Sequence, residues 1–142
     1  MSGAGAVTVT DTAYGQIATN SDTSSEVATK TIDTKHIAVT GTEAKVREYF
    51  SDIPVLIQVA RCESQFRHTL EDGSVLRGKV DSRDTGVMQI NAGYHKATAL
   101  KLGLDLENFS DNMAYARYLY HQQGTKPWSA SASCWNRSLA SL

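Results

Sequence analysis

The feature that most constrains this chain is the apolar run Ile53–Cys62, which is followed directly by Glu63. If the run forms a helix, apolar side chains cover most of its circumference, and a helix of this kind is buried. Glu63 continues the helical row that contains Leu56 and Ala60. The run therefore predicts a buried helix with a carboxyl group at its end, on a face shared with core residues.

Two interpretations of Glu63 are consistent with this position. Burial disfavours the charged form of a carboxyl group and raises its pKa, and an acid that stays protonated near neutral pH can donate a proton to a leaving group. Alternatively, Glu63 is a solvated carboxylate at the exposed end of the helix, because carboxylates are seldom fully buried without a partner. The residues after Glu63 bear on this choice.

The segment 67–91 is rich in glycine and aspartate. Asp72-Gly73 is typical of a turn, and short strands are expected at 79–80 and 87–90 because apolar residues alternate there. The segment predicts a small antiparallel sheet.

Asp84 is expected on a turn of this sheet, two residues before Gly86. A second carboxylate at this point could face Glu63 across a cleft, which is the pairing that glycoside hydrolysis uses. Asp81 is the competing candidate, and either aspartate could simply form the turn.

Two short motifs resemble those of a known group. Residues 63–66 (ESQF) and 84–91 (DTGVMQIN) are similar to the Glu-Ser and Gly-x-Met-Gln-Ile motifs of the lysozyme superfamily. The resemblance covers about residues 43–135 and is closest to soluble lytic transglycosylase domains, and the second motif is equally similar to animal-type lysozymes. It implies a general acid/base at Glu63, a second carboxylate at Asp84 in the animal-type pattern, and sugar contacts at Ser64, Met88, Gln89 and Asn91.

The end of the chain departs from the transglycosylase pattern. Many of those domains carry an Ala-Tyr-Asn-Ala-Gly stretch that supplies an active-site tyrosine, whereas this chain has Pro127-Trp128-Ser129. This departure leaves the tyrosine's role unassigned, and Tyr115, in a tyrosine-rich segment, is the candidate for it. Trp128 is a candidate for the sugar cleft, where its ring could also keep Glu63 neutral, and core packing is its alternative role.

The chain has two cysteines, Cys62 next to the candidate acid and Cys134 near its end. A disulfide bond between them would fasten the last segment beside the buried helix and would indicate an oxidising compartment. Two buried free thiols are the alternative.

Composition changes near residue 42. Residues 1–41 are rich in Ser, Thr, Ala and Gly with few large apolar side chains, so we expect a flexible tail or linker there and one domain over 42–142. Further helices are expected from Thr42 towards Ile53, from Pro54 onward, over 94–102, and over 111–123 with Ser110 as its N-cap.

Several classes of function are disfavoured. The net charge of −1 gives no electrostatic case for nucleic acid or an anionic membrane, and no run of eighteen apolar residues is present for a membrane span. The histidines do not have the spacing of a metal site, and no export signal is visible. We expect no metal, no cofactor and a monomer.

The sequence therefore predicts a mostly helical α+β domain of lysozyme-like fold, with a small β-hairpin region and a substrate cleft. The resemblance implies cleavage of the β-1,4 bond between N-acetylmuramic acid and N-acetylglucosamine in peptidoglycan, by a secreted, envelope or phage-associated protein. A lytic transglycosylase forming 1,6-anhydro products is the first expectation. The alternatives are a hydrolytic lysozyme that uses Glu63 and Asp84, and a peptidoglycan-binding module without turnover.

Overall fold

The computed structural model describes residues 34–142, with side chains from residue 41 onward. Most of the predicted tail, residues 1–33, lies outside the described residues. The chain divides into two units, Met1–Ile37 and Ala38–Leu142. The second unit contains Glu63 and both cysteines.

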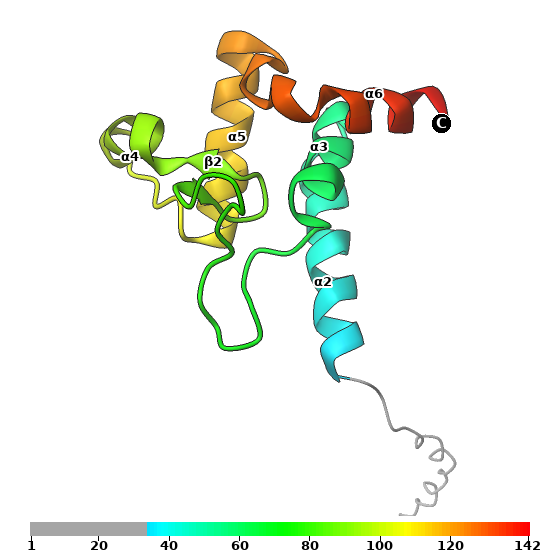
Figure 1. Cartoon of the computed structure of the whole chain (residues 1–142), viewed down its shortest axis with the longest axis horizontal. Coiled ribbons are helices and arrows are strands. Elements are labelled where there is room, and N and C mark those ends of the chain that lie inside the picture. The colour runs from blue at the N-terminus through cyan, green and yellow to red at the C-terminus, as the bar shows by residue number, and fades with distance from the viewer. Residues whose placement is uncertain (1–33) are drawn as a thin grey trace, which may run out of the picture. The chain divides into compact units, whose positions relative to one another are not determined.

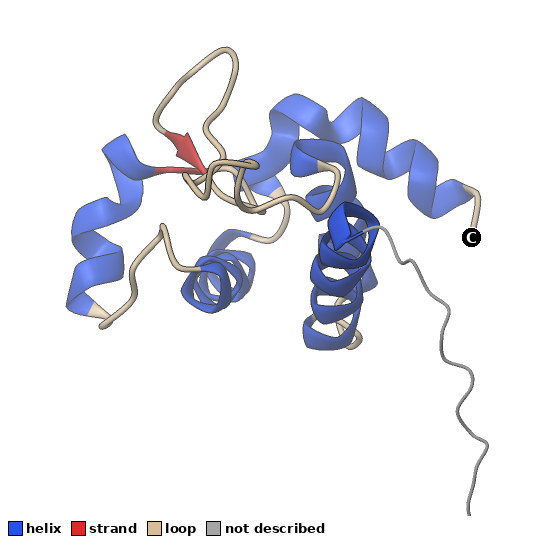
Figure 2. Ribbon diagram, turned by 90° about the horizontal axis from the view of Figure 1, so that it is seen from below, coloured by secondary structure: helices blue, strands red, loops and turns tan. Residues whose placement is uncertain are grey.

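Helices dominate this second unit, and a short two-stranded antiparallel sheet interrupts them (Figure 1, Figure 2). This confirms the predicted α+β, mostly helical class. In chain order, the elements of the described residues 34–142 are α2 (Thr34–Tyr49), α3 (Pro54–Ser64), β1 (Asp84–Thr85), β2 (Ile90–Asn91), α4 (Ala92–Lys101), α5 (Phe109–Gln123), the 3₁₀-helix η3 (Lys126–Ser131) and α6 (Ala132–Ala140).

α2 differs from its prediction at both ends. It passes through Gly41 and Thr42, because a glycine inside a helix weakens it by about 1 kcal/mol relative to alanine but does not end it. At its other end the helix stops at Tyr49. A tight turn comes next, in which the Ile53 N–H donates to the Phe50 carbonyl over 2.8 Å.

α3 begins at Pro54 as predicted, since proline in the first turn of a helix loses no intrahelical hydrogen bond. Its side chains at Leu56, Val59 and Ala60 are fully buried. The prediction of a buried helix leading to Glu63 is confirmed.

The sheet is shorter than predicted and lies elsewhere. β1 and β2 pair with Asp84 opposite Asn91 and Thr85 opposite Ile90, whereas strands at 79–80 and 87–90 were expected. Val80 is fully exposed on a bend, and residues 86–89 form the turn between the strands. Asp84 therefore lies in β1 and not on a turn, while the turn predicted at Asp72-Gly73 is confirmed by the bond from the Gly73 N–H to the Leu70 carbonyl.

The helices α4 and α5 end at the glycines that the sequence predicted as their C-terminal stops. Gly103 and Gly124 come after α4 and α5 with φ values of +76° and +63°, in the region that favours glycine. The predicted N-cap of α5 was wrong: the side-chain oxygen of Asn108, not that of Ser110, accepts the N–H of Asp111 over 3.0 Å. The helix thus starts two residues earlier than the pattern suggested.

α6 packs against α3, across which it lies in Figure 1. The predicted disulfide bond joins Cys62 of α3 to Cys134 of α6, with 6.1 Å between their Cα atoms. Trp135 and Trp128 are both buried in the same core as α3. The bond therefore holds the end of the chain beside Glu63.

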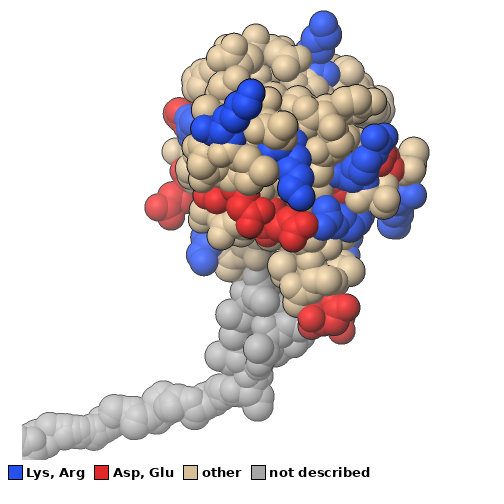
Figure 3. Space-filling view, turned by 90° about the vertical axis from the view of Figure 1, so that its left-hand side faces the viewer, with Lys and Arg blue, Asp and Glu red and all other residues tan. Residues whose placement is uncertain are grey.

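The charged side chains do not form a field of one sign. Figure 3 shows Lys and Arg interspersed with Asp and Glu on one face, in keeping with the small net charge. No helix within residues 34–142 combines the length and apolar character that crossing a bilayer requires.

Candidate functional site

Glu63 lies in the last turn of α3 and is half-buried. Its Oε1 atom accepts a hydrogen bond of 2.6 Å from the Ser131 hydroxyl. Loss of water around the carboxyl group raises its pKa, the bond from Ser131 opposes that rise, and the negative charge of Asp84 adds to it. Burial has the largest effect, so the protonated form of Glu63 persists to higher pH than in an exposed glutamate.

The backbone reverses immediately after α3. Gln65 and Phe66 have positive φ values of 56° and 63°, which non-glycine residues adopt only rarely. Ser64 stabilises this end of the helix, because its hydroxyl lies within hydrogen-bond distance of two carbonyls, that of Val87 at 2.8 Å and that of Ala60 at 3.0 Å, and can donate its one hydrogen to either. Ser64 thereby ties the residue next to Glu63 to the turn between the strands.

That turn, residues 86–89, requires glycine at its first position. Gly86 has a φ of +75°, and a Cβ atom there would lie 2.6 Å from both Asn112 Nδ2 and His68 Cε1. Any side chain would collide with two buried groups. The glycine of the DTGVMQIN motif is therefore explained by packing behind the turn.

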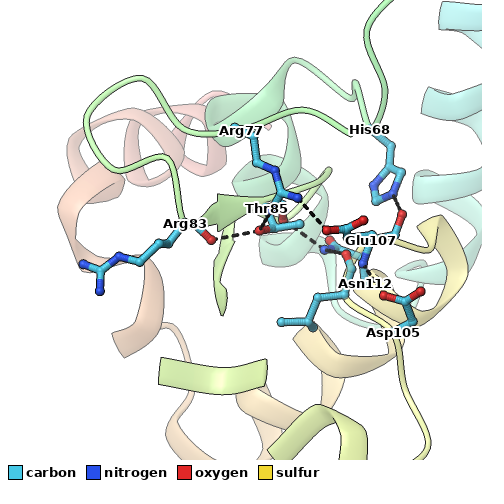
Figure 4. A network of polar contacts seen from close by, with 8 residues as sticks. His68, Arg77, Arg83, Thr85, Asp105, Glu107 and Asn112 are labelled. Atoms are coloured by element: carbon cyan, nitrogen blue, oxygen red, sulfur yellow. Dashed lines mark hydrogen bonds and ion pairs between the residues drawn. The ribbon is translucent and has the colours of Figure 1, made fainter. Parts of the chain in front are cut away.

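Asn112 holds the turn from α5. Its side chain is fully buried, and its Oδ1 accepts the Met88 N–H over 3.0 Å. Its Nδ2 donates to the Thr85 carbonyl over 3.0 Å and the Leu106 carbonyl over 2.8 Å (Figure 4). The Asn112 side chain thus makes the hydrogen bonds to the turn backbone that a neighbouring strand would otherwise make.

His68 holds the same turn from the loop after α3. Its Nδ1 accepts the Val87 N–H over 3.1 Å, and its Nε2 lies 2.8 Å from the Glu107 carbonyl (Figure 4). Both contacts are satisfied only by the neutral ring with its hydrogen on Nε2. Burial also lowers the pKa of His68, in agreement with that state.

Glu63 faces a cavity of about 360 Å³, within the range of roughly 300–1,000 Å³ usual for small-molecule sites. Five of the eight predicted catalytic and substrate-contacting residues line it. These five are Glu63, Asp84, Gln89, Asn91 and Trp128. Two other hollows, one beside the 69–79 loop and one between α4 and the 104–107 loop, lie away from Glu63.

The structure separates the two competing aspartates. Asp84 lines the cavity and Asp81 does not, although Asn91 Nδ2 donates to both, over 2.9 Å to Asp84 Oδ1 and over 3.0 Å to Asp81 Oδ2. Asp81 instead pairs with Arg83 over 2.7 Å, which holds the pKa of Asp81 well below its usual range. Asp84 is therefore the second carboxyl group of the cavity.

Trp128 combines both of the roles considered for it. It lines the cavity, yet its side chain is only 3% exposed, and its Nε1 donates to the Met88 carbonyl over 2.9 Å. This bond joins η3 to the turn between the strands. Trp128 is thus a fixed wall of the cavity.

Three predicted sugar contacts do not line the cavity. Ser64, Met88 and Tyr115 have exposed fractions of 2%, 0% and 1%, so their side chains cannot touch a ligand directly in this conformation. Tyr115 instead lies behind His95, with its hydroxyl 3.1 Å from His95 Nδ1. We reassign these three residues from ligand contacts to the packing that supports the cavity.

Sequence reasoning missed His95 and Ser131. His95 lines the cavity beside Tyr94 and Gln123, and burial lowers its pKa. No local pattern marked His95. The predicted disulfide bond could have revealed Ser131, because it placed the residues just before Cys134 next to Glu63.

The comparisons with known proteins add no identification. Protein-family models, curated proteins and solved structures all gave no match to this chain. Within residues 34–142, no three His, Cys, Asp or Glu side chains are grouped so as to hold a metal ion.

Proposed function

We propose that the protein cleaves the β-1,4 glycosidic bond between N-acetylmuramic acid and N-acetylglucosamine in peptidoglycan, with Glu63 as the general acid. The observation that carries the proposal is a half-buried carboxyl group with a raised pKa in the wall of a cavity. Such a group can protonate a glycosidic oxygen near neutral pH. The resemblance of residues 63–66 and 84–91 to lysozyme-superfamily motifs supplies the substrate class and the lysozyme-like fold.

The remaining groups in the cavity suit a sugar. Tyr94 offers an exposed aromatic ring, on which the apolar face of a sugar ring can pack, and Gln89 and Asn91 bear amide groups. The disulfide bond between Cys62 and Cys134 favours an oxidising compartment. We therefore place the protein outside the cell, in the cell envelope or with a phage particle.

The first candidate mechanism is that of a lytic transglycosylase. Glu63 gives its proton to the leaving oxygen as the bond from C1 breaks, and its carboxylate then takes the proton of the muramic O6 hydroxyl as O6 bonds to C1. The product is a 1,6-anhydro sugar, and no water is consumed. One carboxyl group suffices, and Glu63 has the raised pKa that the first step needs.

The second candidate mechanism is hydrolysis. Asp84 favours hydrolysis, because it lines the same cavity and lies near enough for its charge to raise the pKa of Glu63. A second carboxylate can stabilise or capture the oxocarbenium-like centre until water completes the reaction. The product then carries a reducing end and is heavier by one water.

Mass spectrometry of muropeptides released from purified peptidoglycan tests both mechanisms. Anhydro products indicate the transglycosylase, and reducing-end products indicate the lysozyme, after which Asp84→Asn becomes the next variant. Glu63→Gln should lower the rate by roughly 10²–10⁴-fold, the usual contribution of a general acid. Glu48→Gln, the same change at an exposed residue of α2, is the matched control.

Measurements of pH dependence add a second check. The acid form of Glu63 is lost as the pH rises through its raised pKa, so the rate should fall on that alkaline side. Above the same pKa the folded protein contains a poorly solvated charge, and Glu63→Gln should therefore leave the melting temperature unchanged or slightly higher. Substantial cleavage by Glu63→Gln, or no product from the wild type, would contradict the proposal.

A further inference from the structure

Ser131 is the last residue of η3, and it lies beside Glu63 although 68 residues separate them in sequence. Its hydroxyl is within reach of two acceptors, Glu63 Oε1 at 2.6 Å and the Trp128 carbonyl at 3.2 Å. A hydroxyl has only one hydrogen to donate. Which acceptor receives it determines what Ser131 does.

The geometry favours Glu63 as the acceptor. A separation of 2.6 Å is typical of a hydroxyl that donates to a carboxylate. The Trp128 carbonyl is more distant, and it already accepts the Nε1–H of Trp135 over 3.0 Å. The Ser131 hydrogen therefore points to Glu63.

The consequence concerns the two oxygens of the carboxyl group. Oε1 is occupied by the Ser131 hydrogen, whereas no hydrogen bond to Oε2 is found among residues 41–142. A proton on Oε1 would meet the hydrogen of the hydroxyl and would require it to turn away. The protonated group thus keeps its own hydrogen on Oε2.

We propose that Ser131 is the positioning residue of Glu63, which fixes Oε1 as an acceptor and leaves the transferable proton on Oε2. This inference rests on the proposed function, in which Glu63 is first an acid and then a base. Ser131 can donate to Oε1 in both states, so the carboxyl group keeps its orientation through the reaction. The same bond stabilises the carboxylate and partly offsets the effect of burial on the pKa of Glu63.

Both ends of this hydrogen bond are fixed to each other. Cys62 precedes Glu63, Cys134 comes three residues after Ser131, and the disulfide bond joins them. Trp128 fixes the start of the same turn of η3 through its bond to the Met88 carbonyl. Ser131 is thus held next to Glu63 by a covalent bond and a buried hydrogen bond.

Carbon-13 NMR titration of the Glu63 side-chain carboxyl group tests the inference without substrate. Ser131→Ala should raise the pKa of Glu63, because it removes a hydrogen bond to the charged form, and Ser131→Thr should restore the wild-type value. Ser131→Val, which has the shape of the threonine variant without its hydroxyl, should match Ser131→Ala. Ser129→Ala, at an exposed residue of η3, should leave the pKa unchanged.

Kinetics on peptidoglycan give the second measurement. Ser131→Ala should lower kcat roughly tenfold, the value of about one hydrogen bond, with KM unchanged and with the alkaline limb of the pH profile moved upward. Ser131→Thr should recover most of kcat. A role in folding alone would move neither the pH profile nor the titration.

The two measurements separate the two proposals. An unchanged Glu63 pKa in both Ser131→Ala and Ser131→Val overturns the inference, whatever the activity of the wild type. A raised pKa in these variants together with a wild-type protein that releases no muropeptides overturns the proposed function and supports Ser131 as the partner of Glu63.

Discussion

The two sides of the turn at residues 86–89 are built differently. Behind it, the side chains of His68 and Asn112 make five hydrogen bonds to backbone N–H and carbonyl groups of residues 85–88 and of the 106–107 segment. In front of it, Glu63 has Ser131 as its single hydrogen-bond partner among the described residues, and its burial raises its pKa. In residues 41–142, Asn91 Oδ1 is the only buried side-chain nitrogen or oxygen atom without a hydrogen-bond partner, and Asn91 also lines the cavity.

This difference separates support from chemistry. A polar group whose bonds are all made within the protein stabilises one conformation and has little left to offer a ligand. A carboxyl group that is desolvated and only partly bonded is less stable in its charged form, and this is the property that a proton donor requires. Changes to His68 and Asn112 behind the turn should therefore affect stability first, whereas changes to the Glu63 carboxyl group and its partner Ser131 in front should affect activity first.

The largest change in stability is expected from the disulfide bond, which holds the front wall through α6. The double variant Cys62→Ser, Cys134→Ser should lose about 4 kcal/mol of the free energy of unfolding, from the entropy of a loop of about 70 residues. Urea denaturation measures this loss. Wild-type protein kept in reductant should have the same lowered free energy of unfolding as the double variant. A loss below about 1 kcal/mol would mean that packing of α6 on α3 holds the wall without the bond.

Asn112→Ala should have the next largest effect and tests the support behind the turn. The variant leaves the Met88 N–H and two buried carbonyls without partners, which should lower the free energy of unfolding by about 3 kcal/mol. Asn136→Ala, at an exposed residue of α6, is the control and should stay within about 0.5 kcal/mol. A stable Asn112→Ala variant that has lost only activity would contradict the division between the two sides.

His68→Ala should have a smaller effect that depends on pH. Because burial lowers the pKa of His68 below 6.5, the neutral ring stabilises the fold above pH 6.5, and this contribution is lost as the pH falls through 6.5 towards the lower folded-state pKa. The difference in unfolding free energy between wild type and variant should be about 1–2 kcal/mol at pH 7.5 and should shrink in acid. Urea titrations at several pH values measure it, and a difference that is constant with pH would show that the neutral ring is not what matters.

Local patterns predicted much of the helical framework. The apolar run before Glu63, Pro54 at its start, and the glycines at 103 and 124 act through nearest neighbours along the chain, and the structure confirmed each. The predicted strand at 87–90 was wrong because its backbone found hydrogen-bond partners that are distant in sequence. The N–H groups of Val87 and Met88 found partners in His68 and Asn112, which are 19 and 24 residues away, so no ladder formed there.

The sequence alone predicted the buried helix and the carboxyl group at its end, and it proposed the pairing of the two cysteines and Asp84 as one of two candidates for a second carboxyl group. Only the tertiary structure decided which groups surround Glu63, because contacts such as those of Ser131 and His95 join residues far apart in the chain and leave no periodicity in it. It also moved Ser64, Met88 and Tyr115 out of the cavity and into its support. The physical reason is that burial depends on all the elements that pack around a residue, whereas a motif records only its neighbours in sequence.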